Sequence, residues 1–247
     1  MIKYIFLFLI AITCNSNAQD NPKSKEDKEN YITEKTTRSL TRYEKKSRNS
    51  AVKIINGGHG SGSLLNLNGV HLVITAQHVI DGLSIGAPVT VMSPNREIQV
   101  GYIVYSDESS DIGFIYLKRK FKSRREVSYF PNYRLKQIPK VGSTTIYSGY
   151  PSSLNLLSIR GSVSGFQKDK KGRQIIILNT FGWFGCSGSG VFNSYGELIG
   201  VLFAVSVDQG QVLDNIIWVS PIGNVDNYLL MKNICNVGNA TFCPKKP

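Results

Sequence analysis

The chain has few residues with which to bind a metal ion. Its 247 residues include 3 histidines and 4 cysteines, and neither Cys-x-x-Cys nor His-x-x-x-His spacing occurs. Closely spaced ligand pairs of this kind are typical of metal sites in proteins. We therefore expect no dedicated metal site, and we expect no cofactor.

Long apolar runs are missing except at the N-terminus. Residues 1–18 contain one lysine, an apolar stretch, and then small or polar residues ending at Ala18. This pattern is typical of a secretory signal peptide and is too short to remain as a transmembrane anchor. We expect cleavage after Ala18 and export, either to the periplasm or out of the cell. Lipid attachment at Cys14 is a less favoured alternative, because Ile12 and Thr13 fit poorly before a lipidated cysteine.

Removal of the signal peptide leaves three cysteines in an oxidising environment. Cys235 and Cys243 would close a short loop near the C-terminus, so a disulfide between them is the natural pairing within the tail at residues 233–247. Cys186 is then single, and we expect it to be a small buried apolar residue.

Acidic residues are scarce, since 17 Asp and Glu face 29 Lys and Arg, and the formal net charge is +12. Such a charge favours anionic partners without selecting among them. Part of the excess lies in Lys118–Lys136, where four aromatic residues lie among the basic ones: Phe121, Tyr129, Phe130 and Tyr133. This segment is either a solvated, flexible connection or a patch that holds an anionic polymer or surface. Nucleic acid is not expected as the ligand of an exported chain.

The pattern of apolar residues divides the mature chain into three parts. Residues 19–50 are nearly all polar, so we expect a flexible segment with at most a helical turn or two at residues 34–46. From residue 51, short apolar runs bounded by turn residues indicate an antiparallel all-β fold in two halves, at about 51–130 and 138–220. Helical spacing at residues 221–232 predicts a C-terminal helix packed on the second half.

The most distinctive stretch is residues 185–190, Gly-Cys-Ser-Gly-Ser-Gly, directly before an apolar strand. A serine between small residues allows main-chain N–H groups to converge on one point, as a nucleophile with an oxyanion pocket requires. A tight β-turn would have the same composition, so the stretch alone does not decide.

Other residues of the chain offer partners for such a serine. His78 ends an apolar strand, which is a rigid position for a catalytic base, whereas His71 lies in a turn and His59 in a glycine-rich loop. Asp111 opens another apolar strand, where a carboxylate is costly unless it has a partner. A histidine cation would be that partner.

Three motifs then occur in the order His, Asp, Ser: Thr-Ala-x-His-Val around His78, Asp-Ile-Gly around Asp111, and Gly-x-Ser-Gly-Ser around Ser187. Over about residues 51–231 the chain resembles trypsin-like serine peptidases of the chymotrypsin fold, most closely the bacterial HtrA and glutamyl endopeptidase types. The resemblance implies a peptidase domain over residues 51–232, with two six-stranded antiparallel β-barrels and a short C-terminal helix. Because the chain ends soon after that helix, we expect no PDZ domain.

The resemblance also implies residue roles in an exported serine endopeptidase that acts on proteins or peptides. His78 would be the base, Asp111 its orienting acid, and Ser187 the nucleophile. The family pattern that follows the nucleophile continues without a gap from Ser187, but not from Ser189. The backbone N–H groups of Gly185 and Ser187 would form the oxyanion hole. Relatives activated by cleavage have an aspartate before the nucleophile, and Cys186 cannot replace it, so we expect no such activation.

Specificity is harder to read from the sequence. By alignment the pocket for the residue before the cut is bordered by Phe181 and by a strand, Leu202-Phe203-Ala204-Val205. No acid lies in these positions, which predicts apolar or small side chains, although Asp208 or Asp214 reaching in from a loop stays open. A catalytically silent binding module of the same fold, holding an anionic envelope or protein partner, is the alternative function. All three catalytic residues are retained, which favours the enzyme.

Overall fold

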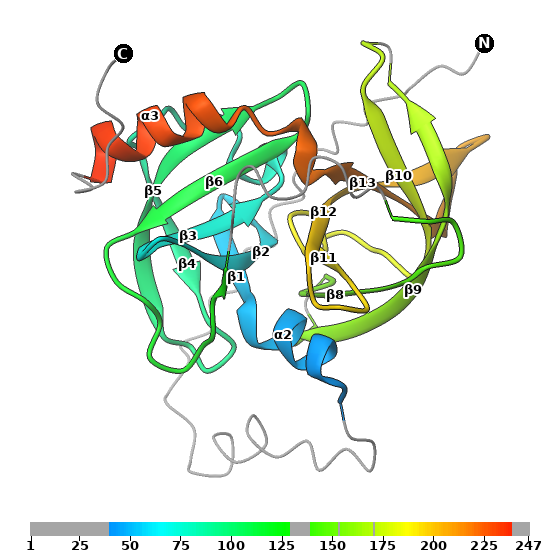
Figure 1. Cartoon of the computed structure of the whole chain (residues 1–247), viewed down its shortest axis with the longest axis horizontal. Coiled ribbons are helices and arrows are strands. Elements are labelled where there is room, and N and C mark those ends of the chain that lie inside the picture. Colours follow the sequence, from blue (N-terminus) through cyan, green and yellow to red (C-terminus); the bar gives the residue numbers. More distant parts are fainter. Residues whose placement is uncertain (1–39, 129–138, 153, 170, 239–247) are drawn as a thin grey trace, which may run out of the picture. The chain divides into compact units, whose positions relative to one another are not determined.

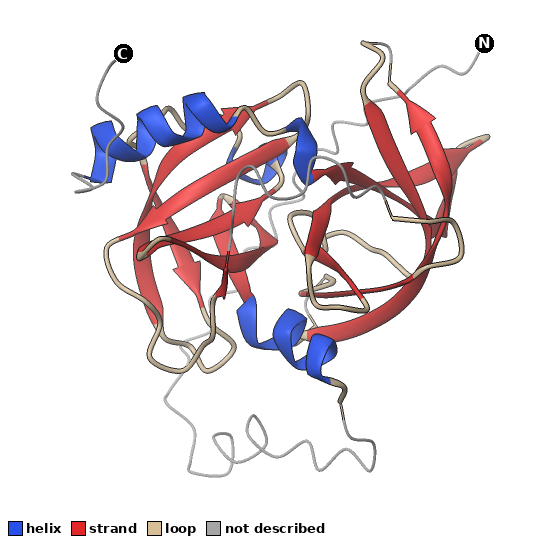
Figure 2. Ribbon diagram, viewed as in Figure 1, coloured by secondary structure: helices blue, strands red, loops and turns tan. Residues whose placement is uncertain are grey.

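The computed structural model describes residues 40–128, 139–152, 154–169 and 171–238, all within the compact unit Arg38–Pro247. Over these residues the chain forms two β-barrels and two α-helices (Figure 1). Strands make up most of the fold, and the helices lie outside the barrels (Figure 2). The predicted all-β fold with two six-stranded antiparallel barrels is confirmed.

The first barrel has the strand order β1-β4-β5-β6-β3-β2 and closes where β2 pairs with β1. A short β7 is added to β2 in parallel. The bounds of the strands are β1 (Ala51–Asn56), β2 (Gly58–Leu67), β3 (Val70–Thr75), β4 (Pro88–Met92), β5 (Ile98–Asp107), β6 (Ile112–Leu117) and β7 (Val127–Ser128).

The second barrel is closed in the order β10-β13-β12-β11-β8-β9. Its longer strands form hairpins that extend away from the first barrel (Figure 1). The bounds of the strands are β8 (Thr144–Gly149), β9 (Leu157–Lys168), β10 (Gln174–Asn179), β11 (Gly190–Asn193), β12 (Leu198–Asp208) and β13 (Gln211–Pro221).

Alternating side chains fill each barrel, and a third cluster joins them. Leu64, Val73 and Ile115 are fully buried in the first barrel. In the third cluster Phe114 of the first barrel packs in one core with Phe192 of the second. Burying each such side chain contributes about 1.5–3 kcal/mol, so the shared cluster stabilises the contact between the barrels as well as each barrel.

Helix α2 (Arg42–Ser50) corrects the predicted start of the domain at residue 51. Thr41 and Glu44 form a capping box at its N-terminus. The buried Glu44 carboxylate pairs with Arg160 of β9, and Ser47 Oγ lies 2.9 Å from Ser148 Oγ of β8. The hydrogen bond from Arg160 lowers the pKa of Glu44 to about 2. Polar partners replace apolar burial here, so composition alone misidentifies this helix as solvated chain.

The C-terminal helix also differs from the prediction. After a short turn, η2 (Ile222–Asn224), helix α3 spans Asn227–Gly238 and so ends later than the expected residue 232. It contacts β5 and β6 of the first barrel, whereas the sequence predicted packing on the second half. The Asp226 N–H donates to Tyr105 Oη at 3.0 Å, which directs the chain back across to the first barrel.

The basic segment Lys118–Lys136 is described up to Ser128 and is partly structural. Phe121, expected among the exposed aromatic residues, is buried in the core of the first barrel. The Arg124 guanidinium donates to the Ala51 carbonyl at 3.3 Å, and Glu126 lies 2.7 Å from His71. This part of the segment therefore anchors β7 to the barrel, and its remainder lies outside the described residues.

Two further expectations concern the chain ends. Cys235 lies in α3, while Cys243 and residues 1–39 lie outside the described part of the chain, so the disulfide and the signal peptide stay predictions. Among the described residues, no helix is long and apolar enough to cross a membrane.

Candidate active site

One carboxylate holds His78 through both of its oxygens, one on the imidazole and one on the backbone N–H. His78 lies in η1 (Gln77–Ile80), directly after β3, and Asp111 lies in the turn before β6. Asp111 Oδ2 is 2.7 Å from His78 Nδ1, and Asp111 Oδ1 accepts from the His78 backbone N–H at 2.9 Å. With Nδ1 engaged, Nε2 is the ring nitrogen left to take up a proton. The structure thus brings together the first two predicted residues.

The backbone of Asp111 is in the left-handed region, with φ of 52°. This conformation costs about 1 kcal/mol or more for a residue with a side chain, although aspartate tolerates it better than most. Strained backbone of this kind concentrates at functional sites. The two hydrogen bonds to His78 offset the cost and keep the carboxylate facing the imidazole.

Ser187 lies in a tight turn between Cys186 and Gly188, and its side chain is partly exposed. The turn is closed by main-chain bonds, with Ser189 N–H donating to the Cys186 carbonyl at 3.0 Å and Gly188 N–H to the Leu202 carbonyl at 2.8 Å. Gly188 has φ of 90°, and a Cβ there would stand 2.0 Å from the Ser61 carbonyl oxygen. Only glycine fits at this position, which explains that part of the motif.

Ser61 of β2 fixes the turn from the first barrel. Its N–H donates to the Ser187 carbonyl at 2.8 Å, and its hydroxyl donates to the Gly185 carbonyl at 2.7 Å. The Tyr150 N–H in turn donates to Ser61 Oγ at 2.9 Å. One fully buried serine therefore holds both carbonyls that flank the nucleophile turn. This role was not predicted, and its only signal in the sequence is the Gly-Ser-Gly-Ser run of β2.

Two main-chain N–H groups beside Ser187 are available to a ligand. Within the described part of the chain, neither Gly185 N–H nor Ser187 N–H has an acceptor. Gly185 has φ of 92°, and a Cβ there would lie 2.4 Å from the Tyr150 carbonyl oxygen. Unpaired N–H groups held rigidly next to a serine can stabilise an oxyanion.

The packing of glycines shows that the nucleophile turn lies against the segment that contains His78. A Cβ on Gly188 would stand 3.0 Å from the Ala76 nitrogen, and a Cβ on Gly60 would meet both Val79 and the Ser187 carbonyl. Among the described residues, no hydrogen bond joins Ser187 Oγ to His78. Such bonds are often long without substrate and tighten in the complex.

The second serine of the motif has a different environment. Ser189 is fully buried, and its Oγ has no hydrogen-bond partner among the described residues. A Cβ on the neighbouring Gly149 would stand 2.2 Å from this oxygen, so no space remains around it. Ser189 Oγ is inaccessible to a substrate, which leaves Ser187 as the candidate nucleophile.

The remaining histidines have separate positions. His71 pairs with Glu126 on the side of the first barrel, at 2.7 Å. His59 Nε2 would lie 2.8 Å from a Cβ on Gly185, so its ring lies beside the predicted oxyanion hole. Among the described residues, no group of His, Cys, Asp and Glu is arranged to hold a metal ion.

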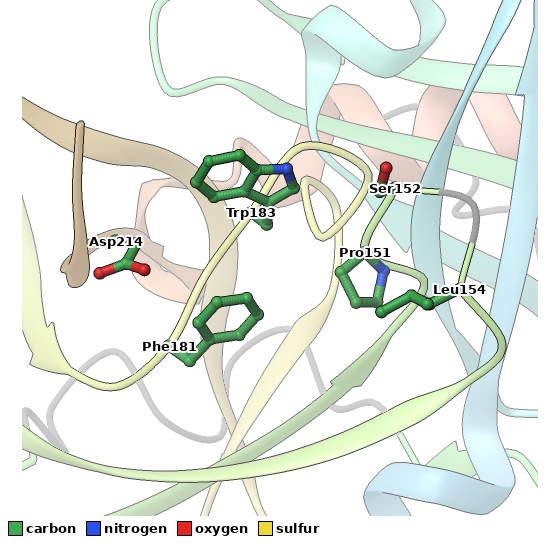
Figure 3. A pocket seen from close by; sticks show the side chains of 6 residues that line it. All are labelled: Pro151, Ser152, Leu154, Phe181, Trp183 and Asp214. Carbon is green, nitrogen blue, oxygen red and sulfur yellow. The ribbon is translucent and has the colours of Figure 1, made fainter. Parts of the chain in front are cut away.

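An open pocket of about 460 Å³ lies beside the nucleophile turn (Figure 3). The loop after β8 forms one wall and the segment before Gly185 forms the other, with Asp214 of β13 at its margin (Figure 3). The two walls are joined by the Ser152 N–H, which donates to the Phe184 carbonyl at 2.6 Å. The lining residues are Pro151, Ser152, Leu154, Phe181, Trp183 and Asp214.

This pocket differs from the one predicted. Of the expected lining residues, Phe181 is present, but none of Leu202, Phe203, Ala204 and Val205 lines it. Leu202 is buried in the core of the second barrel, and the Phe203 ring packs edge-on against Trp218 at 6.3 Å. The alternation of apolar and polar residues does not predict which side chains of β12 face the pocket, because the pairing of β12 with β13 shifts register at these residues.

Cys186 has the structural role that was expected. It is buried in the core of the second barrel, with Tyr147 Oη 3.7 Å from its sulfur. Burial raises the pKa of the thiol, so Cys186 is held as a neutral packing residue beside the candidate nucleophile.

Solved structures with the same fold extend this description. A crystal structure of Rv3671c from M. tuberculosis H37Rv, a serine-to-alanine mutant in an inactive form, is 18% identical with a TM-score of 0.57, covering 83% of this chain and 93% of that one. The serine endoprotease from Yersinia pestis is 19% identical with a TM-score of 0.60, covering 78% of this chain and 68% of that one. At these identities the likeness concerns the fold alone.

A search of curated protein sequences found no match to the chain. The model of the trypsin-like peptidase domain matches residues 60–201, which is more than half of the chain and contains His78, Asp111 and Ser187. The chain therefore belongs to the trypsin-like peptidase domain family.

Proposed function

We propose that the chain is an exported serine endopeptidase that cleaves peptide bonds through an acyl-enzyme. The observation that carries this proposal is the His78–Asp111 pair, with 2.7 Å between Nδ1 and Oδ2, together with the packing of the Ser187 turn against the segment that contains His78. An orienting acid, a base and a partly exposed serine beside unpaired N–H groups are the components that acyl transfer requires.

In the first step Ser187 Oγ attacks the carbonyl carbon of the peptide bond, and His78 Nε2 takes up the hydroxyl proton. The carbonyl oxygen becomes an oxyanion, which accepts hydrogen bonds from the N–H groups of Gly185 and Ser187. Loss of one such donor costs about 3–4 kcal/mol of barrier. The C–N bond then breaks, and His78 returns the proton to the leaving amine while Asp111 stabilises the cation. Water, deprotonated by His78, hydrolyses the ester and regenerates the serine.

The edge of β12 is suited to a protein or peptide substrate. Its residues 198–201 pair with β11, but from Phe203 onward its partner among the described strands is β13 alone. An extended peptide can add to such an edge through main-chain hydrogen bonds. Main-chain recognition would place the scissile bond in register with Ser187 and leave side-chain selection to neighbouring pockets.

Export rests on the sequence of residues 1–18. Mass spectrometry of the protein from culture medium and cell envelope should find a mature chain that begins at Gln19. A lipid-modified N-terminus at Cys14, removed by Cys14→Ser, is the outcome that would contradict cleavage after Ala18.

Labelling with a fluorophosphonate probe tests the catalytic site directly. The mature protein should be labelled, Ser187→Ala should not, and Ser189→Ala should be labelled like the unchanged protein because its hydroxyl is buried. A folded protein that takes up no probe would overturn the proposal. The catalytically silent binding module would then be favoured, in line with the missing hydrogen bond between Ser187 and His78 in the described structure.

A further inference from the structure

The pocket beside the nucleophile turn contains a single charged residue. Asp214 is exposed, and its carboxylate forms no ion pair within the described part of the chain. The other lining residues are neutral, and the chain as a whole has a net charge of +12. An unpaired carboxylate at a pocket of a strongly basic protein can attract a cationic group.

The position of Asp214 is fixed by main-chain bonds to the pocket wall. The Gly182 N–H donates to the Asp214 carbonyl at 2.7 Å, and the Thr180 N–H donates to the Asn215 carbonyl at 3.1 Å. The Tyr147 hydroxyl donates to the Phe181 carbonyl on the same wall. The main chain that carries the Asp214 side chain and the main chain of the aromatic wall are thus joined by hydrogen bonds.

The walls of the pocket are apolar and exposed. Phe181, Trp183 and Leu154 are 42%, 38% and 55% exposed, although such side chains are ordinarily covered. The Trp183 ring is supported edge-on by Phe184 at 5.6 Å. Aromatic rings attract cations, and the methylene chains of lysine and arginine cover apolar surface while their charged ends reach polar groups.

These features select one class of occupant. A neutral apolar side chain would cover the walls but leave Asp214 without a partner, and an acidic one would be repelled. The pocket volume, about 460 Å³, lies within the range of about 300–1,000 Å³ that is common for ligand sites. A lysine or arginine side chain meets both the apolar walls and the carboxylate.

We propose that this pocket is a substrate subsite for a lysine or arginine side chain and that Asp214 determines its specificity. The inference rests on the proposed peptidase function. The pocket wall continues directly into Gly185 and Ser187, so the bound side chain belongs to the same peptide whose carbonyl reaches the nucleophile. This replaces the expectation of a pocket for apolar or small side chains without an acid.

The test uses internally quenched peptides in which lysine, arginine, norleucine or glutamate occupies each position around the cut in turn. At one position the unchanged protein should cleave lysine and arginine peptides about fivefold faster in kcat/KM than norleucine peptides, which have an uncharged stem of similar length. The effect is this small because Asp214 is exposed and its charge is screened. Asp214→Asn should abolish the preference, and Asp214→Lys should reverse it toward glutamate.

Glu108→Gln is the matched control, because it removes an exposed carboxylate that does not line the pocket. It should leave the preference unchanged. A preference that is absent from the unchanged protein, or that persists in Asp214→Asn, overturns the inference.

Fluorophosphonate labelling of the same proteins separates this inference from the proposed function. Equal labelling without any lysine preference overturns the subsite alone. If the unchanged protein is not labelled, NMR can still test the pocket. It would compare the binding of N-acetyl-lysine methylamide with that of its norleucine counterpart. Binding that is selective for lysine and lost in Asp214→Asn supports a cation pocket without catalysis, whereas equal binding overturns it.

Discussion

Two long strands of the second barrel, β9 and β13, are less buried than β3 and β6 of the first, although β8 of the second barrel has five of six residues buried. In the first barrel, β3 and β6 each have five of six residues buried. In the second barrel, β9 has one buried residue among twelve and β13 has three among eleven. The long strands of the second barrel extend beyond its core, as Figure 1 shows.

This difference corresponds to a division of roles. His78 and Asp111 lie at the ends of the deeply buried strands β3 and β6, where proton transfer has the fixed geometry that it needs. The pocket with Asp214 lies on the exposed part of the second barrel, where side chains can change without disturbing a core. The fold thus separates the chemistry from the selection of substrates, and the following changes test that separation.

The largest expected effect comes from Asp111→Asn. The amide side chain removes the charge that stabilises the His78 cation and favours the wrong ring tautomer, so kcat should fall about 10⁴-fold. Steady-state kinetics and the thermal unfolding midpoint should be measured together, with Asp81→Asn as a control in the neighbouring turn. A loss below tenfold in a folded protein would contradict the assignment of Asp111.

The next effect concerns stability, at the contact of α2 with the second barrel. Folding lowers the pKa of Glu44 from 4.5 to about 2, mainly through its hydrogen bond with Arg160. The Glu44 carboxylate therefore contributes about 3 kcal/mol to the free energy of unfolding. This contribution is complete above about pH 4.5 and is lost as the pH falls toward 2. Glu44→Gln should lower the free energy of unfolding at neutral pH and flatten its dependence on pH in this window.

Lys45→Gln is the control for that measurement, because Lys45 is exposed on the same helix. Denaturant unfolding at pH 3, 5 and 7 would compare the two variants. Parallel pH profiles for Glu44→Gln and the unchanged protein would show that α2 does not contribute in this way.

A smaller effect is expected where the first barrel holds the turn of the second. Ser61→Ala removes the hydrogen bond to the Gly185 carbonyl but keeps the main-chain bond to Ser187. Because the turn is then held less firmly, the activation free energy should rise by about 1–1.5 kcal/mol. This should reduce kcat about tenfold with little change in KM. Ser63→Ala, two residues along β2, removes an acceptor of the Gly190 N–H and serves as the control. Equal kinetics for the two variants would dismiss a positioning role for Ser61.

The fold and the pairing of His78 with Asp111 could be predicted because they depend on local patterns. Alternating apolar residues between turn residues specify strands, and the glycines around Ser187 reflect close main-chain contacts that no other residue permits. The pairing of His78 with Asp111 could be predicted because a carboxylate at the start of an apolar strand costs free energy unless it has a partner.

The parts that were missed depend on contacts between distant segments. Helix α2 is held by Glu44 with Arg160, more than a hundred residues away, and a polar composition gives no sign of such a partner. Asp214 reaches the pocket because β13 pairs with β10 and continues along the segment that contains Phe181, to which it is hydrogen-bonded through Gly182. The spacing of apolar residues does not predict such a pairing. Leu202 lies in the core of the second barrel, next to a register shift in β12 that the alternation of the sequence does not reveal.

The crossing of the chain ends between the barrels has a mechanical consequence. Helix α2 docks on the second barrel immediately before β1 enters the first, and α3 docks on the first barrel after β13 has left the second. Each half therefore holds a segment of the other in addition to their shared core. A single cut in the chain between the barrels would leave the halves fastened together, with the Ser187 turn still packed against the segment that contains His78. Such a nicked protein should remain active until α2 or α3 is detached as well.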